Sequence, residues 1–165
     1  MVDAIVAADN PLDDQATAAD ENAPEPRAAA LRLAIERFYF GYRAFTAPPD
    51  RILGRRGLGR VHHRILYFVG RNPRISVNAL LGILDVSKQA LHAPLRQLVE
   101  KRLVVMDTAE HDRRVRQLAL TSAGRKLEAQ LTNTQMLQLH AVFERAGADA
   151  EAGWQQVMRN LAGQG

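Results

Sequence analysis

The sequence contains no cysteine, and this absence excludes several kinds of chemistry. A chain without thiols forms no disulfide, holds no metal through thiolate ligands and senses no oxidant through cysteine oxidation. The lack of disulfides also fits a reducing compartment, so we expect a cytoplasmic protein.

Long hydrophobic runs are missing as well. The longest apolar stretches, "ILYFV" at 65–69 and "ALLGIL" at 79–84, are far shorter than the roughly 20 residues that a membrane-spanning helix needs. No lysine or arginine precedes an apolar run near the N-terminus, which argues against a secretory signal. We therefore expect no membrane partner.

The first 26 residues lack lysine and arginine but hold seven acidic residues, with very little apolar surface to bury. Such a composition is typical of a disordered segment, because it cannot offset the entropy of ordering the chain. We expect residues 1–26 to form a disordered acidic arm and residues 27–165 to form one folded domain.

Patterns typical of enzymes and metal sites are also lacking. The sequence shows no Ser-His-Asp spacing, no carboxylate pair in an apolar setting and no cofactor-binding loop. His62 and His63 are adjacent, so on a helix their side chains point about 100° apart, and no carboxylate at helical spacing completes a metal site. The sequence therefore predicts no catalytic residues, no cofactor and no metal.

Positive charge is what the chain has in excess. The net charge of the whole chain is +4, and residues 51–126 hold 16 lysines and arginines against five acidic residues. A field of that sign attracts polyanions, of which nucleic acid is the commonest in a cytoplasm. A basic surface that is merely solvated is the alternative.

The first part of the domain has the apolar periodicity of a helix. This helix is expected to begin at Arg27 and to stop at Pro48 and Pro49. Its apolar stripe consists of Leu31, Ile35, Phe38, Tyr42 and Phe45. The following segment, "RILGRRGLGR", reads as a linker that either contacts phosphate or is solvated, and it lacks the spacing of a nucleotide-binding loop.

The next segments have the outline of a helix-turn-helix. "RVHHRILYFVGRNP" predicts a short helix, and Ser76 is placed to cap a second one, "VNALLGIL". "DVSKQALHAPLRQLVEKRL" follows after a turn of two or three residues, with leucines at helical spacing. Two short helices joined by a tight turn form the motif whose second helix reads the major groove.

The pattern then changes from helix to strand. "LVVMDT" is β-branched and apolar, "AEHDRR" is polar, and "VRQLALT" alternates, which together predict a hairpin with a basic tip. Two more helices, split near Gly147, are expected over residues 122–162. Their apolar stripes have few core partners in their own chain, so we expect a homodimer.

This succession resembles the MarR family of bacterial transcriptional regulators, which are dimeric winged helix-turn-helix proteins. The resemblance runs from about Arg27 to Leu161. Its most specific parts are the Asp-Arg-Arg at 112–114 with the strand "VRQLALT", the Ser-Ala-Gly-Arg at 122–125, and "ISVNALLGILDVSKQALHAPLRQLVEKRLV", which matches the helix-turn-helix without a gap.

The resemblance implies a mainly α fold with a small β-hairpin wing. The winged helix-turn-helix is expected at about 59–121, and dimerisation helices at about 27–47 and 122–162. The implied function is that of a ligand-responsive repressor, which binds double-stranded DNA at a pseudo-palindromic operator as a homodimer. A winged-helix module that binds a protein partner is the alternative.

The candidate DNA contacts lie on the second helix of the motif and on the wing. Glutamine suits adenine and lysine suits guanine or phosphate, whereas Arg96 is expected to grip the DNA backbone. The resemblance places Arg114 in the minor groove with Asp112 as its salt-bridge partner; a solvated hairpin tip is the alternative. The candidates are Ser76, Ser87, Lys88, Gln89, His92, Arg96, Asp112, Arg113, Arg114 and Arg116.

Three more of these candidates also have an alternative role. His92 either contacts DNA or is solvated. Arg113 and Arg116 either contact phosphate or pack inward.

The resemblance also implies that a small, often aromatic acid binds between the dimer-forming and DNA-reading parts. Residues expected to line this effector pocket are Tyr39, Arg43, His63 and Arg64. Their alternative role is in core packing or in salt bridges across the dimer.

The sequence departs from the family pattern at three places. Arg102 stands where a glycine is usual, so either it adopts a left-handed conformation, which costs roughly 1 kcal/mol, or the helix ends differently. Pro94 lies inside the recognition helix, where it should bend the axis. Gln89, Ala90 and His92 replace small hydroxyl residues, so the resemblance implies no operator sequence.

Overall fold

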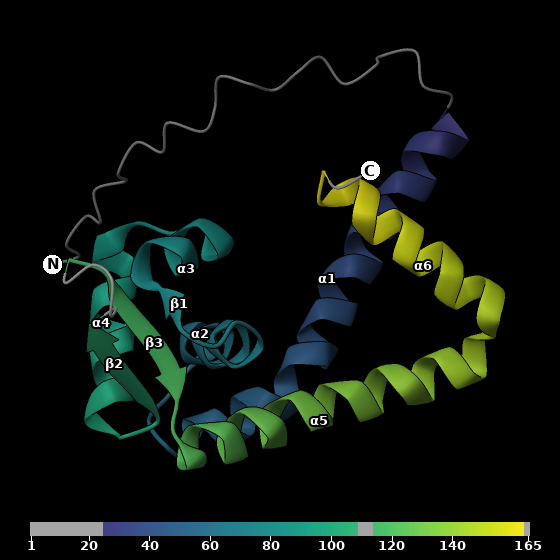
Figure 1. Cartoon of the computed structure of the whole chain (residues 1–165). Coiled ribbons are helices and arrows are strands. Elements are labelled where there is room, and N and C mark those ends of the chain that lie inside the picture. The colour runs from purple at the N-terminus through teal and green to yellow at the C-terminus, as the bar shows by residue number, and fades with distance from the viewer. Residues whose placement is uncertain (1–24, 109–113, 164–165) are drawn as a thin grey trace, which may run out of the picture. The chain divides into compact units, whose positions relative to one another are not determined.

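The computed structural model describes residues 25–108 and 114–163 (Figure 1). The predicted acidic arm lies outside these residues except for its last two, which begin the first helix. The elements are α1 Glu25–Gly54, α2 Arg60–Arg71, β1 Ile75–Ser76, α3 Val77–Leu84, α4 Lys88–Glu100, β2 Val104–Thr108, β3 Arg116–Leu120, α5 Ser122–Ala146 and α6 Ala148–Leu161. This mainly helical order with a small sheet confirms the predicted fold class.

The chain divides into two compact units, residues 1–41 and 42–165. In the first unit the described part is the beginning of α1, which carries the apolar stripe as an exposed surface. The second unit holds the end of α1 and all other elements, including the helix-turn-helix and the sheet.

The prediction that the first helix stops at Pro48 and Pro49 is wrong, because α1 continues to Gly54. Proline has no N–H, so Pro48 leaves the carbonyl of Ala44 without its usual donor. Nε2 of Gln138 on α5 supplies that donor at 3.1 Å. A side chain from another helix thus satisfies one backbone group that the prolines leave open, and α1 runs through both of them.

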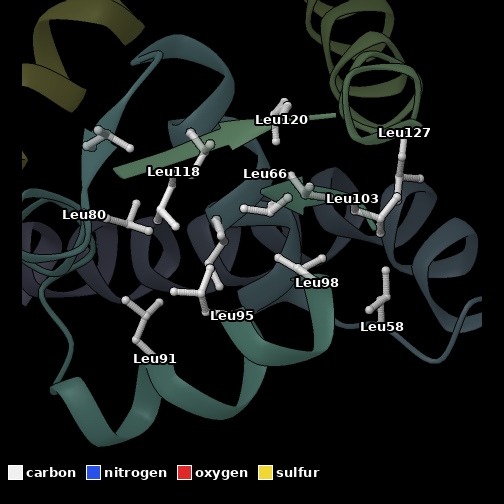
Figure 2. Packing of buried hydrophobic residues seen from close by; sticks show 14 of the residues in the cluster. Leu58, Leu66, Leu80, Leu91, Leu95, Leu98, Leu103, Leu118, Leu120 and Leu127 are labelled. Carbon is white, nitrogen blue, oxygen red and sulfur yellow. The ribbon is translucent and has the colours of Figure 1, made fainter. Parts of the chain in front are cut away.

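The core of the second unit lies where α2, α4 and the sheet meet. Leu66 on α2 and Leu118 on β3 are fully buried. Figure 2 shows that Leu91, Leu95 and Leu98 on α4 turn toward this centre. Each fully buried leucine stabilises the fold by roughly 1.5 to 3 kcal/mol, so this packing fixes how α4 lies against the rest of the unit.

The sheet has three antiparallel strands in the order β1-β3-β2. The predicted hairpin corresponds to β2 and β3, which pair from Val104 opposite Leu120 to Thr108 opposite Arg116. The sequence did not reveal β1, because a strand of two residues shows no periodicity. Its Ile75 pairs with Leu118, so the strand before α3 is joined to the wing.

The end of α4 is joined to the start of α5 through the backbone of Arg102 and Leu103, just before β2. Arg102 adopts a φ of 56°, which confirms the left-handed alternative for this residue. The hydroxyl of Thr121 donates to the Arg102 carbonyl at 2.7 Å, and the Thr121 N–H donates to the Leu103 carbonyl at 3.1 Å. The same hydroxyl caps α5 by accepting from the N–H of Gly124 at 2.9 Å.

Gly124 has no room for a side chain. A Cβ added to this residue would collide with the carbonyl of Leu103, a backbone atom that cannot rotate away. The contact between α5 and the backbone just before β2 therefore depends on glycine at position 124.

We expect Gly124→Ala to lower the free energy of unfolding by about 1 to 3 kcal/mol, because the added methyl group forces the two backbones apart. The matched control is Gly82→Ala in the middle of α3, where nothing lies within 4 Å of an added Cβ. That change should raise stability by about 0.5 to 1 kcal/mol. Urea denaturation measures both variants; equal stability of Gly124→Ala and the parent would contradict the prediction.

Candidate nucleic-acid interface

Two serines fix where the helices of the helix-turn-helix begin. Ser76 Oγ accepts from the N–H of Ala79 at 3.1 Å, and Ser87 Oγ accepts from the N–H of Ala90 at 3.2 Å. Both bonds satisfy orphan donors in the first turn of a helix. Each hydroxyl keeps its proton as a donor, which is the group that a phosphate oxygen accepts.

The outer face of α4 carries the four residues predicted to contact DNA from this helix. Lys88, Gln89, His92 and Arg96 are all exposed. The opposite face carries the three leucines of the core. Helical spacing thus separates a polar stripe from an apolar one on the same short helix.

Two further features of α4 are an ion pair at Arg96 and a proline within the helix. Arg96 Nε lies 3.5 Å from Oε1 of Glu100, an exposed ion pair one turn apart, and such a pair contributes little to stability. α4 runs from Lys88 to Glu100 through Pro94 without interruption. The predicted bend at Pro94 stays a prediction.

Two of the predicted arginines of the wing lie close together in the sequence, Arg116 as the first residue of β3 and Arg114 just before this strand. Arg114 and Arg116 are exposed, and Arg116 Nη1 donates to the Thr108 hydroxyl across the hairpin at 3.0 Å. Arg116 therefore does not pack inward, which was one of its two predicted roles. Asp112 and Arg113 lie outside the described residues, and so does the predicted pairing of Asp112 with Arg114.

A cavity of about 360 Å³ lies among α1, α2 and α5 in the second unit. His63 and Arg64, two of the four predicted pocket residues, line it. Tyr39 and Arg43 are not among its lining residues. The sequence did not reveal the aromatic wall of this cavity, which consists of Tyr42, Phe45, Tyr67 and Phe68.

Charged groups at this cavity are partly neutralised. Arg60 Nη2 lies 2.8 Å from Oδ2 of Asp50, and its hydrogen bond to this carboxylate raises the pKa of Arg60. Burial lowers the pKa of His63, although the nearby carboxylates of Glu128 and Asp50 oppose the effect. His63 Nε2 is buried and has no hydrogen-bond partner among the described residues.

Residues 25–108 and 114–163 contain neither a candidate membrane span nor a candidate metal site. No helix there is both long and apolar enough to cross a bilayer. In the same residues, no three His, Asp or Glu side chains gather as metal ligands would.

Comparison with known proteins shows which family the chain resembles. The sequence model of the MarR family matches residues 56–115. The chain is 42% identical over 131 residues to the HTH-type transcriptional regulator PetP of Rhodobacter capsulatus, which covers 79% of each chain.

Solved structures show the same fold at lower identity. A MarR family transcription regulator superposes with a TM-score of 0.70 at 20% identity, covering 83% of this chain and 91% of that one. FabT of Streptococcus pneumoniae, solved in complex with DNA, gives 0.71 at 18% identity and covers 80% and 94%. The architecture is that of a winged helix-turn-helix protein, and the chain belongs to the MarR family.

The partly buried imidazole of His63 predicts a pH dependence of stability. Because folding lowers its pKa from 6.5, the unfolded chain binds a proton at pH values where the folded chain does not. Stability should therefore fall as the pH drops below about 6.5 and toward the folded pKa. In His63→Gln this part of the decrease should disappear.

Denaturation of the parent and of His63→Gln at pH 7.5 and 5.5 measures the difference. The other histidines are the same in both proteins, so only the difference between the two decreases counts. Equal decreases would show that His63 is not held neutral by the fold.

Proposed function

We propose that this protein is a transcription regulator that binds double-stranded DNA through α4 and the wing. The observation that carries the proposal is the exposed stripe of Lys88, Gln89, His92 and Arg96, which a leucine face locks onto the core of a MarR-family fold. The relative PetP is itself named a transcriptional regulator, and the neighbour FabT was solved in complex with DNA.

The side chains of the stripe divide into base-reading and backbone-binding groups. The amide of Gln89 suits N6 and N7 of adenine, and Lys88 suits O6 and N7 of guanine or a phosphate. Arg96 binds the DNA backbone by exchanging Glu100 for a phosphate. The hydroxyls of Ser76 and Ser87 donate hydrogen bonds to further phosphates. His92 supplies an additional contact beside them.

The wing supplies the second group of contacts. Arg114 enters the minor groove, where narrow A·T tracts concentrate negative potential. Asp112 orients its guanidinium, while Arg113 and Arg116 bind phosphates. Because Arg116 is already held by Thr108, this contact orders little new structure.

The protein acts as a homodimer. The described part of α1 in the first unit exposes Leu31, Ile35, Phe38 and Phe40, each by more than 40%. Separately, α5 and α6 expose Met136, Leu137, Trp154, Val157 and Leu161 to a similar degree. Apolar faces of this size call for a second copy, and two copies present two α4 helices to half-sites about one helical turn apart.

A small effector regulates the repressor through the cavity. Aromatic walls beside Arg64 and His63 suit an aromatic acid, whose ring packs on the walls and whose carboxylate meets the arginine. The cavity lies beside α2, which packs on α4 through the core. Binding there therefore shifts the balance between conformations with different DNA affinity.

Selection of DNA from a random duplex pool, followed by titration at two salt concentrations, tests the DNA-binding function. We expect an enriched pseudo-palindrome and an affinity that falls steeply with salt, because bound phosphates release counterions. Absence of binding even at low salt would leave the alternative, a winged-helix module for a protein partner.

Arg114→Ala should weaken operator binding by roughly 1 to 3 kcal/mol and flatten the plot of log K against log salt by about one unit, each for every half-site bound, and it should weaken the preference for A·T pairs beside each half-site. Arg114→Lys keeps the charge but not the planar group, so it should recover the salt slope more than the A·T preference.

Gln89→Ala is the matched comparison for Arg114→Ala. It should cost discrimination at one base position with little change in the salt slope. The proposal for the wing is wrong if Arg114→Ala binds the operator as tightly as the parent at physiological salt.

Truncation before Ala148 removes α6 and should produce monomers or aggregates, because it removes much of the apolar face that a second copy covers. Removal of residues 1–26, the matched control, should leave a dimer whose operator affinity is within a few-fold of the parent. Sedimentation and operator titration measure both. A truncated protein that stays a soluble, DNA-binding dimer would contradict the assignment of α6.

A further inference from the structure

The turn between α1 and α2 is a rigid element. The N–H of Arg56 donates to the Leu53 carbonyl at 2.9 Å, and the N–H of Leu58 donates to the same carbonyl at 3.0 Å. Gly57 adopts a φ of 64°, and Leu58 is buried in the core. The glycine and arginine segment is thus a tight, anchored turn and not a loose linker.

A chain of hydrogen bonds attaches this turn to the recognition helix. The N–H of Gly59 donates to Nδ1 of His62 at 3.0 Å, so the ring proton is on Nε2. His62 Nε2 then donates to Oε1 of Gln97 at 2.7 Å, and Gln97 Nε2 donates to the Gly57 carbonyl at 3.4 Å. Since Gln97 follows Arg96 on α4, the turn is held beside the DNA-reading stripe.

Two arginines project from this turn without a counter-charge among the described residues. Arg55 and Arg56 are exposed, and their guanidinium groups make no hydrogen bond or ion pair with the described residues. Arg60, by contrast, is paired with Asp50. Residues 51–60 include four arginines and no acidic residue, so the positive charge of the turn is not neutralised within its own segment.

We propose that Arg55 and Arg56 form a phosphate-binding edge that extends the DNA interface beyond α4 and the wing. This inference rests on the proposed function. A rigid backbone reduces the entropy lost when the two side chains bind, and attachment to α4 means that docking of this helix brings them toward the same duplex. DNA is favoured over an acidic protein because the turn is tied to the helix that reads bases.

Contacts of this kind add affinity without adding sequence preference. Phosphates look alike at every base step, so arginines bound to them position the protein and carry no base information. Each such contact contributes about 0.9 to the slope of log K against log salt. Loss of these arginines should therefore change the salt slope and not the sequence preference, whereas loss of Gln89 should do the opposite.

The test compares Arg55→Gln, Arg56→Gln and the double variant with the parent on the selected operator. Substitution of both arginines removes four phosphate contacts from the dimer, so it should flatten the salt slope by about 3.6 units, lower affinity at physiological salt by roughly a hundred- to a thousandfold and leave the selected sequence unchanged. Arg71→Gln, at the other end of α2, is the matched control: it removes one exposed charge and should leave the slope as in the parent.

Gln97→Ala tests whether the hydrogen-bond chain positions the edge. This variant keeps every arginine but removes the hydrogen bonds that attach the turn to α4. The salt slope should therefore flatten partway toward that of the double variant. Combined with Arg55→Gln and Arg56→Gln, it should cause no further flattening, because the contacts it positions are already gone. Circular dichroism and the melting temperature check that each variant is folded.

The outcomes separate this inference from the proposed function. If the parent binds no duplex, the proposed function fails. If the parent binds its operator and the folded double variant keeps the parent's slope, the phosphate-binding edge is wrong while the proposed function stands.

Discussion

The close approach of α5 to the backbone of Leu103 is the constraint on which the rest of the second unit depends. Gly124 allows this approach because it has no Cβ, and Thr121 completes it by bonding to the carbonyl of Arg102 and to the N–H of Gly124. Within about twenty residues, the contact joins the end of the recognition helix, both long strands of the wing and the start of the helix that leaves them. This arrangement requires Arg102 to adopt a left-handed backbone conformation, which is strained for a residue with a side chain.

That junction gives the DNA-reading parts a common frame. β2 leaves the junction and β3 returns to it, so the arginines at the start of β3 are placed relative to α4 by the sheet. Ser87 sets the first residue of α4, and three leucines set its rotation about its own axis. Gln97 and His62 then attach the turn that carries Arg55 and Arg56. Polar side chains are thus held before any ligand arrives, which lowers the entropic cost of binding.

The sequence predicts what depends on local pattern and misses what depends on distant partners. Helical leucines, capping serines and the alternation of β3 were sufficient for the helix-turn-helix and the hairpin. The continuation of α1 through Pro48 depends on Gln138, 94 residues from Ala44, and no local pattern reveals such a donor. For the same reason the sequence did not reveal the link from His62 to Gln97, and it placed Tyr39 and Arg43 in a cavity that other aromatic residues line.

Chemical footprinting of the dimer on its selected operator tests the DNA-reading role of α4 and the wing most directly. Dimethyl sulfate modifies guanine N7 in the major groove and adenine N3 in the minor groove. The proposed function predicts N7 protection in two half-sites about one helical turn apart, with N3 protection at the A·T pairs flanking each of them. Uniform reactivity across the operator, or protection confined to the minor groove, would contradict it.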